Sequence, residues 1–222
     1  MIAIEVMHMK KPSWYIMAAG LFLAILISNV SSFIIDGRKL DELRGSVLRL
    51  HILANSDSDA DQRLKLMVRD KLLESNIFSG AESLSEAESI AEKKLGYIEY
   101  IAEKTLREHG CYKKVSAAIE DHDFDERVYG DITMPAGRYR ALRVKIGEAK
   151  GHNWWCVMYP PLCLPAACDT EDKHKTETAE LTENKSAEEE HFDEKELDIM
   201  RKPRKYKVKF ALWDKIKELL DE

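Results

Sequence analysis

Dense runs of basic residues are lacking outside one short stretch of this chain, and this limits what the protein can bind. Lysine and arginine total 34 residues against 40 aspartates and glutamates, and the only dense basic run is residues 201–209. Nucleic-acid binding needs a basic face with interleaved aromatic side chains on the folded part. We therefore expect no nucleic-acid partner.

The motifs of common cofactor, metal and catalytic sites are also missing. The chain has no glycine-rich phosphate loop, no Gly-x-Ser-x-Gly elbow and no His-Glu-x-x-His pair. Cys163 and Cys168 lack the second pair of ligands that a zinc site needs. The alternate aspartates from Asp57 resemble the start of a calcium loop, but Gln62 and Val68 stand where glycine and a bidentate glutamate are required. We expect no cofactor, no metal and no catalytic residues.

Only one long apolar run is present, and it lies near the N-terminus. Two lysines precede the 14 uncharged residues 14–27, and polar residues follow, among them Asn29 and three serines. Fourteen residues rise about 21 Å as a helix, short of the roughly 30 Å hydrocarbon core of a membrane. A basic start, a short apolar stretch and small residues at Val30 and Ser32 are typical of an export signal. We expect residues 1–32 to be a signal peptide cleaved after Ser32 or, alternatively, an uncleaved anchor.

The cysteines are few, and export changes how they are interpreted. Outside the cytoplasm the four residues Cys111, Cys156, Cys163 and Cys168 can form disulfides, in three possible pairings. Cys156 and Cys163 lie close in sequence around two prolines, which makes them the candidate disulfide. The alternative is four free thiols, because a chain of this size can be stable without crosslinks.

Periodic patterns predict an α+β domain over residues 33–168. Apolar residues alternate over residues 47–54 as in a half-buried strand, and Ser56 is placed to cap a helix that ends near residues 73–75. A second, long amphipathic helix runs from a cap at Ser83 or Ser85 to Gly110. Four segments rich in β-branched and aromatic residues then follow, at 115–119, 127–132, 139–146 and 154–159. Strand, helix, helix and then a small, mainly antiparallel sheet is the expected order.

The last part of the chain divides into a linker and a tail. Residues 169–198 contain 13 acidic and 4 basic residues and few large apolar ones, so we expect residues 169–200 to form a flexible acidic linker. The tail, residues 201–222, is basic and amphipathic. Alternation over residues 206–212 predicts a strand there, followed by a short helix.

Two segments resemble the signature blocks of the stage II sporulation protein R family. The first is RLHILANSD at residues 49–57, continuing through DQRLK at 61–65 to VRD at 68–70. The second runs from GRY at 137–139 through GHNWWCVMYPPLC at 151–163. The resemblance extends more weakly over about residues 45–165, and KFALW at 209–213 is also similar.

The resemblance implies a sporulation signalling protein that performs no covalent chemistry. It implies secretion from the forespore into the space between the two membranes around it. There the protein would activate a membrane-embedded aspartic protease, the sigma-E processing peptidase, which cleaves pro-sigma-E in the mother cell. A ligand of this kind acts through a higher affinity for the active state of its partner.

The family supplies no catalytic residues, so the candidate partner-binding residues come from the polar and aromatic side chains of the signature blocks. They are Arg49, His51, Asn55, Asp57, Arg69, Trp154 and Trp155. Structural roles compete with binding: Trp154 and Trp155 must face opposite sides of a strand, so one belongs to the core. Asn55 and Asp57 can cap a helix, and His51 can be a strand histidine hydrogen-bonded at the edge of the sheet.

Two other functions stay open from the sequence. In an exported hydrolase or transferase, His51 would pair with a cysteine nucleophile. In a structural protein of the envelope space, the N-terminal segment would be a membrane tether.

Overall fold

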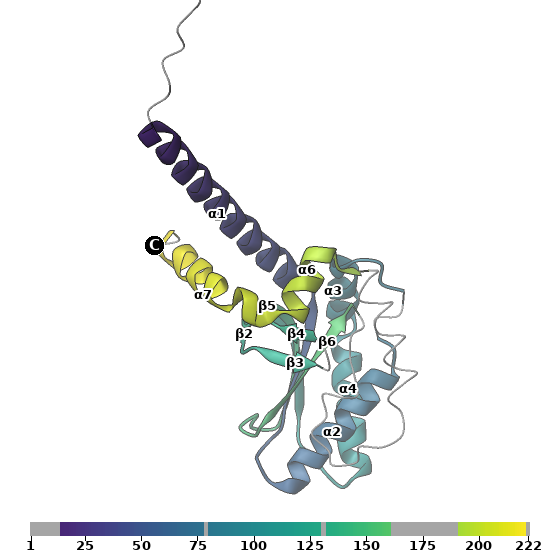
Figure 1. Ribbon diagram of the computed structural model, residues 1–222. Helices are drawn as coiled ribbons and strands as arrows, with labels where there is room; N and C mark the ends of the chain where they lie inside the picture. Colours follow the sequence, from purple (N-terminus) through teal and green to yellow (C-terminus); the bar gives the residue numbers. More distant parts are fainter. Residues whose placement is uncertain (1–13, 78–79, 130–131, 161–190, 221–222) are drawn as a thin grey trace, which may run out of the picture. The chain divides into compact units, whose positions relative to one another are not determined.

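The computed structural model describes residues 14–77, 80–129, 132–160 and 191–220 of the chain (Figure 1). These residues form two compact units: the larger is made by residues 39–207, and the smaller joins the residues up to Arg38 with those from Val208 onward. The larger unit is an α+β domain, which confirms the predicted fold class.

The centre of the larger unit is a four-stranded mixed sheet. Its strands are β1 (Leu48–Leu53), β2 (Val115–Phe124), β5 (Gly137–Ile146) and β6 (Asn153–Tyr159), in the order β2-β5-β1-β6. Two of the three pairings are antiparallel, as expected, and β1 runs parallel to β5. The predicted strand at 127–132 is instead a separate hairpin of β3 (Arg127–Tyr129) and β4 (Ile132–Met134).

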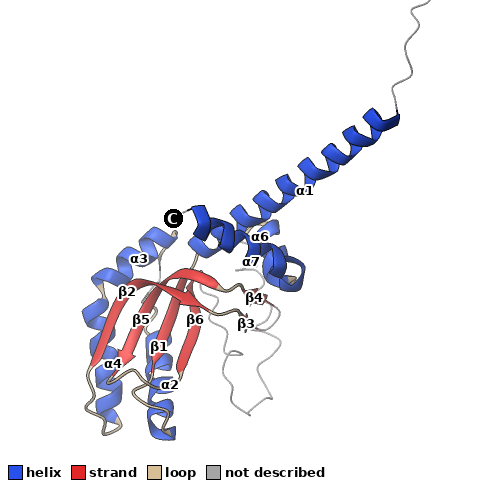
Figure 2. Ribbon diagram, turned by 90° about the vertical axis from the view of Figure 1, so that its left-hand side faces the viewer, coloured by secondary structure: helices blue, strands red, loops and turns tan. Residues whose placement is uncertain are grey.

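Three helices cover one face of this sheet: α2 (Asp59–Glu74), α3 (Leu84–Lys93) and α4 (Leu95–Glu108) (Figures 1 and 2). Ser83 caps α3 as predicted, but the cap of α2 is Ser58 rather than Ser56. The single long helix predicted from residue 83 is wrong, because non-helical backbone angles at Lys94 divide it into α3 and α4. Gly110 ends α4 in a left-handed conformation (φ +74°), as expected.

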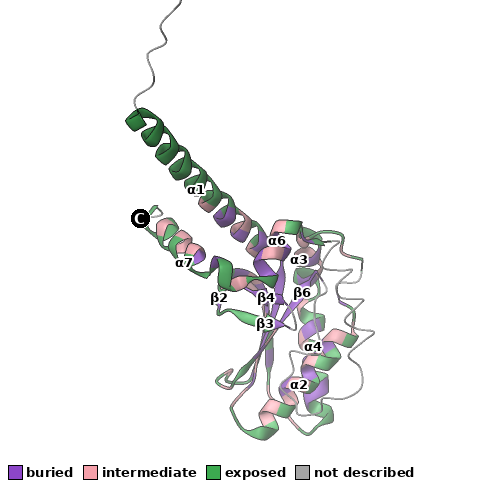
Figure 3. Cartoon of the chain, in the orientation of Figure 1, coloured by how far each residue is buried: buried purple, intermediate pink, exposed green. Residues whose placement is uncertain are grey.

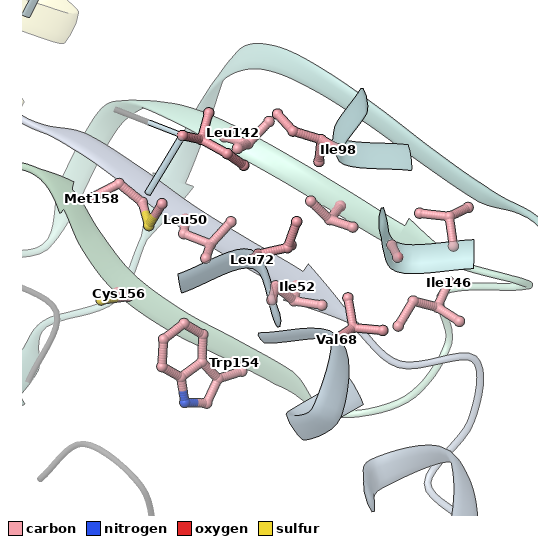
Figure 4. Packing of buried hydrophobic residues seen from close by; sticks show 14 of the residues in the cluster. Leu50, Ile52, Val68, Leu72, Ile98, Leu142, Ile146, Trp154, Cys156 and Met158 are labelled. Carbon is pink, nitrogen blue, oxygen red and sulfur yellow. The ribbon is translucent and has the colours of Figure 1, made fainter. Parts of the chain in front are cut away.

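The main hydrophobic core lies between this sheet face and the helices (Figure 4). Burying one such aliphatic side chain contributes about 1.5–3 kcal/mol, so this layer dominates the stability of the domain. Its fully or almost fully buried members include Leu50, Ile52, Val68, Leu72, Ile98, Leu106, Leu142, Val144 and Ile146.

The end of the predicted acidic linker is a helix, and so is the predicted C-terminal strand. Helix α6 (Glu194–Arg201) starts at a capping box formed by Asp193 and Glu196, and its Ile199 and Met200 are fully buried. Helix α7 (Pro203–Leu220) replaces the strand expected at 206–212. The spacing of its more buried residues, Tyr206, Phe210 and Trp213, is that of a helix face. Residues 161–190, most of the predicted linker, lie outside the described residues.

The smaller unit contains most of α1 (Trp14–Gly45). Among the described helices, α1 is long and apolar enough to span a membrane: an 18-residue window has a mean hydropathy of 2.1 and none of it is buried (Figure 3). A signal sequence meets the same criteria. The helix continues through the serines that were expected to interrupt it, and Asn29 donates its side-chain amide to the carbonyl of Ile25 at 2.7 Å. Cleavage after Ser32 stays a prediction.

Candidate functional site

The sheet face opposite the helices carries two of the candidate residues, Arg49 and His51. Because side chains alternate along a strand, Leu50 and Ile52 of β1 enter the core while these two residues face the other way. The strand was expected to be half-buried, and His51 to lie at the edge of the sheet. Instead β1 is an inner strand, and Arg49 and His51 are 0% and 1% exposed.

Three stacked rings form the most distinctive feature of this face, here called the imidazole–indole cluster: His51, His122 and Trp155. The ring of His51 lies between the other two, with its centroid 4.2 Å from Trp155 and 5.0 Å from His122. The guanidinium of Arg127 lies over the indole at 5.4 Å. His122 and Trp155 are partly exposed, so the cluster offers flat aromatic surface and positive charge to a partner.

Hydrogen bonds fix His51 as a neutral imidazole. Its Nδ1 accepts from the Nε of Arg143 at 3.1 Å, and the side-chain amide of Asn153 lies 2.9 Å from its Nε2. Since a neutral imidazole has one donor and one acceptor nitrogen, Nε2 carries the proton and the amide must present its oxygen. Burial lowers the pKa of His51 to about 3, and the charge of Arg143 acts in the same direction.

Arg49 packs against the aromatic rings next to the cluster and does not reach the protein surface where a partner could bind. Its guanidinium lies 4.1 Å from the ring centre of Phe124 and 4.9 Å from that of Tyr139, and Nη2 donates to the Tyr129 hydroxyl at 2.8 Å. Phe124 in turn meets the edge of Trp155 at 4.6 Å. Because Arg49 is fully buried, its structural role is to position these aromatic rings.

Asn55 and Asp57 fasten the loop between β5 and β6 to the turn after β1, so the expectation that they cap a helix is wrong. The side-chain oxygen of Asn55 accepts from the amide of Glu148 at 3.1 Å. Asp57 accepts from both the backbone amide and the Nδ1 of His152, each at 2.5 Å. These bonds lower the pKa of Asp57, the backbone bond most. The two residues thereby fix the start of β6, which carries Trp155.

A substitution at Gly151 tests whether this loop is packed against the turn after β1. A Cβ at this position would lie 2.2 Å from the carbonyl oxygen of Ser56, which is backbone and cannot move away cheaply. We expect Gly151→Ala to lower the free energy of unfolding by about 1–3 kcal/mol, measured by denaturant unfolding. Gly96→Ala is the matched control, because a Cβ there meets nothing within 4 Å; equal effects of both changes would contradict the close approach.

Trp154 and Arg69 lie on the helix side of the sheet. Trp154 is 7% exposed and belongs to the main core, which confirms that one of the two adjacent tryptophans is a core residue. The guanidinium of Arg69 lies 5.2 Å from the centre of its ring. The candidate residues therefore divide between two faces, and Trp155 and His51 are the pair that the structure brings together beside open surface.

The described cysteines lie apart from His51. Cys111 is free, Cys156 is disulfide-bonded, and both pack in or against the core on the helix side. The ring nitrogens of His51 are bonded to Arg143 and Asn153, so neither of these cysteines forms a nucleophile pair with it. Cys163 lies outside the described residues, and its pairing with Cys156 stays a prediction.

One group of carboxylates in the described part of the chain is close enough to hold a metal: Glu42, Asp193 and Glu196. Lys39 already occupies the position of a cation there, with its Nζ 2.5 Å from Glu42 and 2.6 Å from Asp193. Glu196 accepts from the backbone amide of Asp193 in the cap of α6. These side chains therefore attach the start of α6 to Lys39 at the C-terminal end of α1.

Sequence reasoning missed His122, Arg143, Asn153 and Arg127. The strand predicted at 115–119 continues to Phe124 in the structure, so the alternation that places His122 and Phe124 on one face of β2 was not used. Their meeting with His51 depends on β5 lying between β2 and β1, an order that no local pattern specifies.

Comparisons with known proteins match the part of the chain that contains both signature blocks. Residues 44–169 match the family model described as Stage II sporulation protein R. The curated "Stage II sporulation protein R" of Bacillus subtilis (strain 168) is 35% identical over 182 residues, which cover 78% of this chain and 80% of that protein. No solved structure matches the chain significantly. On these matches, the chain belongs to the stage II sporulation protein R family.

Proposed function

We propose that this protein is an exported sporulation signal that activates a membrane-embedded aspartic protease, the sigma-E processing peptidase, and performs no chemistry itself. It is secreted from the forespore into the intermembrane space, with or without a remaining tether. Binding to the protease favours its active state, and pro-sigma-E is then processed in the mother cell.

The observation that carries this proposal is the imidazole–indole cluster on the sheet face away from the helices. Trp155 is partly exposed and stacked on His51, and the guanidinium of Arg127 lies 5.4 Å from the centre of its ring. Aromatic area together with guanidinium charge is enriched at binding hot spots. His51 is neutral, with its two ring nitrogens engaged, and so serves as a rigid support. Membership of a sporulation family and the apolar α1 support export in the same context.

Reconstitution in a non-sporulating host tests the proposal. The full chain, routed across the membrane, is produced together with the protease and its pro-sigma substrate, and substrate cleavage is followed by size. We expect cleavage to require this chain and to survive replacement of Cys111, which is free. Cleavage without the chain, with every component present, would refute the proposal.

The same assay separates a ligand from an exported Cys/His enzyme. A ligand acts in proportion to its occupancy of the protease, so activation should saturate as its amount rises. Cleavage that continues after the chain has been removed from pretreated membranes would favour covalent modification by an enzyme.

A further inference from the structure

Helix α7 has two apolar faces, and only one of them is packed. On the first face, Tyr206 is fully buried and Phe210 is 8% exposed. The second face consists of Val208, Leu212 and Leu219, which are 82%, 51% and 64% exposed. Spacings of four and seven residues place these three on one stripe, called here the outer stripe.

The packed face joins the C-terminal part of α7 to α1 within the smaller unit. The ring of Trp213 meets the edge of Phe33 with centroids 5.7 Å apart, and it lies so close to Gly37 that a Cβ there would be 2.2 Å from the indole. Lys209 forms an ion pair at 2.6 Å with Asp36, which is 2% exposed. These contacts attach α7 to residues 33–37 of α1.

The residues of α1 that α7 contacts lie at the end of its apolar segment. No charged residue lies between Lys11 and Asp36, and the helical residues 14–35 rise about 33 Å, enough to cross a hydrocarbon core of about 30 Å. Asn29, the polar side chain that argued against a span, satisfies its amide within the helix. With residues 14–35 in a bilayer, Asp36 and the helix attached to it lie at the membrane surface.

The charges of α7 suit an anionic surface. Residues 203–220 contain six lysines and arginines and two acidic residues. Arg204, four residues before Val208, and Lys215, four residues before Leu219, lie along the outer stripe itself. A helix with exposed aliphatic side chains flanked by basic ones is typical of interfacial membrane binding.

We propose that α7 is an interfacial helix that inserts the outer stripe into the headgroup region of an anionic bilayer. The occupant of this stripe is therefore lipid. This inference is independent of the protease partner, since it concerns only how α7 meets the membrane.

Cysteine accessibility in lipid nanodiscs tests the inference on the full-length chain. Leu212→Cys and Leu219→Cys report on the outer stripe, and Glu218→Cys is the matched control elsewhere on the same helix. Reaction with a membrane-impermeant maleimide is followed at each site by peptide mass spectrometry, which separates the introduced cysteine from the native ones. In nanodiscs of mixed phosphatidylcholine and phosphatidylglycerol, we expect the outer-stripe sites to react at least about tenfold more slowly than position 218, which corresponds to 1.4 kcal/mol.

The lipid composition and a partner distinguish the possible outcomes. Protection should weaken in phosphatidylcholine alone and in high salt, because part of the attraction is electrostatic. Equal reaction at positions 212 and 218 in anionic nanodiscs would overturn the inference. So would protection that arises only when a partner protein is added, since the stripe would then bind protein.

Discussion

Replacing Trp154 by alanine is expected to lower the free energy of unfolding by about 3–5 kcal/mol, the cost of a large cavity in a packed core. Trp154 is 7% exposed and packs in the core cluster beneath the helices. Its Nε1 is buried without a hydrogen-bond partner among the described residues. Trp154→Phe should therefore retain most of the stability, because it removes an unsatisfied donor and keeps much of the ring.

Trp155→Ala should show the reverse pattern. This side chain is partly exposed, so we expect a stability loss of about 1–2 kcal/mol from the ring contacts with His51 and Phe124. Activation in the reconstituted system should nevertheless fall at least about tenfold, as expected for a hot-spot residue. Denaturant unfolding of the full-length protein in mild detergent, beside the cleavage assay, separates the two effects. Full activation by a folded Trp155→Ala protein would exclude this face as the binding surface.

The contrast between these neighbours illustrates how far the sequence determines the site. Alternation along β6 required that the two tryptophans face opposite sides, and it was correct. Which of them enters the core depends on which face the helices cover, and that is a property of the whole fold.

Local signals predicted some helix ends correctly, although the cap of α2 is Ser58 rather than Ser56. Ser83 caps α3 and Gly110 ends α4, because an unpaired amide and a left-handed backbone select those residue types. The strand predicted at residues 206–212 was wrong, because the same residues also fit a helix. The alternation over residues 206–212 involves lysines, which are good helix formers, and the helical spacing of Tyr206, Phe210 and Trp213 fits the same residues.

The buried polar groups could not be anticipated from sequence. Arg49 and His51 alternate with leucine and isoleucine, which predicts a solvent-facing side of the strand. In the structure β1 is central, and aromatic residues from β2, β5 and β6 cover that side. The pairing of strands that are far apart in the sequence brings these residues together. The same pairing brings Asn55 and Asp57 into contact with the loop after β5.

The burial of His51 gives the protein a stability that depends on pH in the mildly acidic range. The pKa of His51 is lowered from 6.5 to about 3, so the unfolded chain binds a proton more readily than the folded one. The contribution is therefore fully present above pH 6.5 and is lost as the pH falls toward 3. One pH unit corresponds to 1.36 kcal/mol, so we expect the free energy of unfolding to fall by about 2 kcal/mol between pH 7 and pH 5.

Urea unfolding of the full-length protein at these two pH values measures this fall. His51→Gln should remove most of it, because an amide can accept from Arg143 and donate to Asn153 without titrating. His122→Gln is the comparison: burial also lowers the pKa of His122, but this ring is partly exposed, so its replacement should remove a smaller part of the fall. The carboxylates whose pKa is lowered, Asp57 and Glu120 among them, titrate below this window and add their effect only under more acidic conditions. An unchanged pH dependence in His51→Gln would mean that this imidazole is not the group responsible.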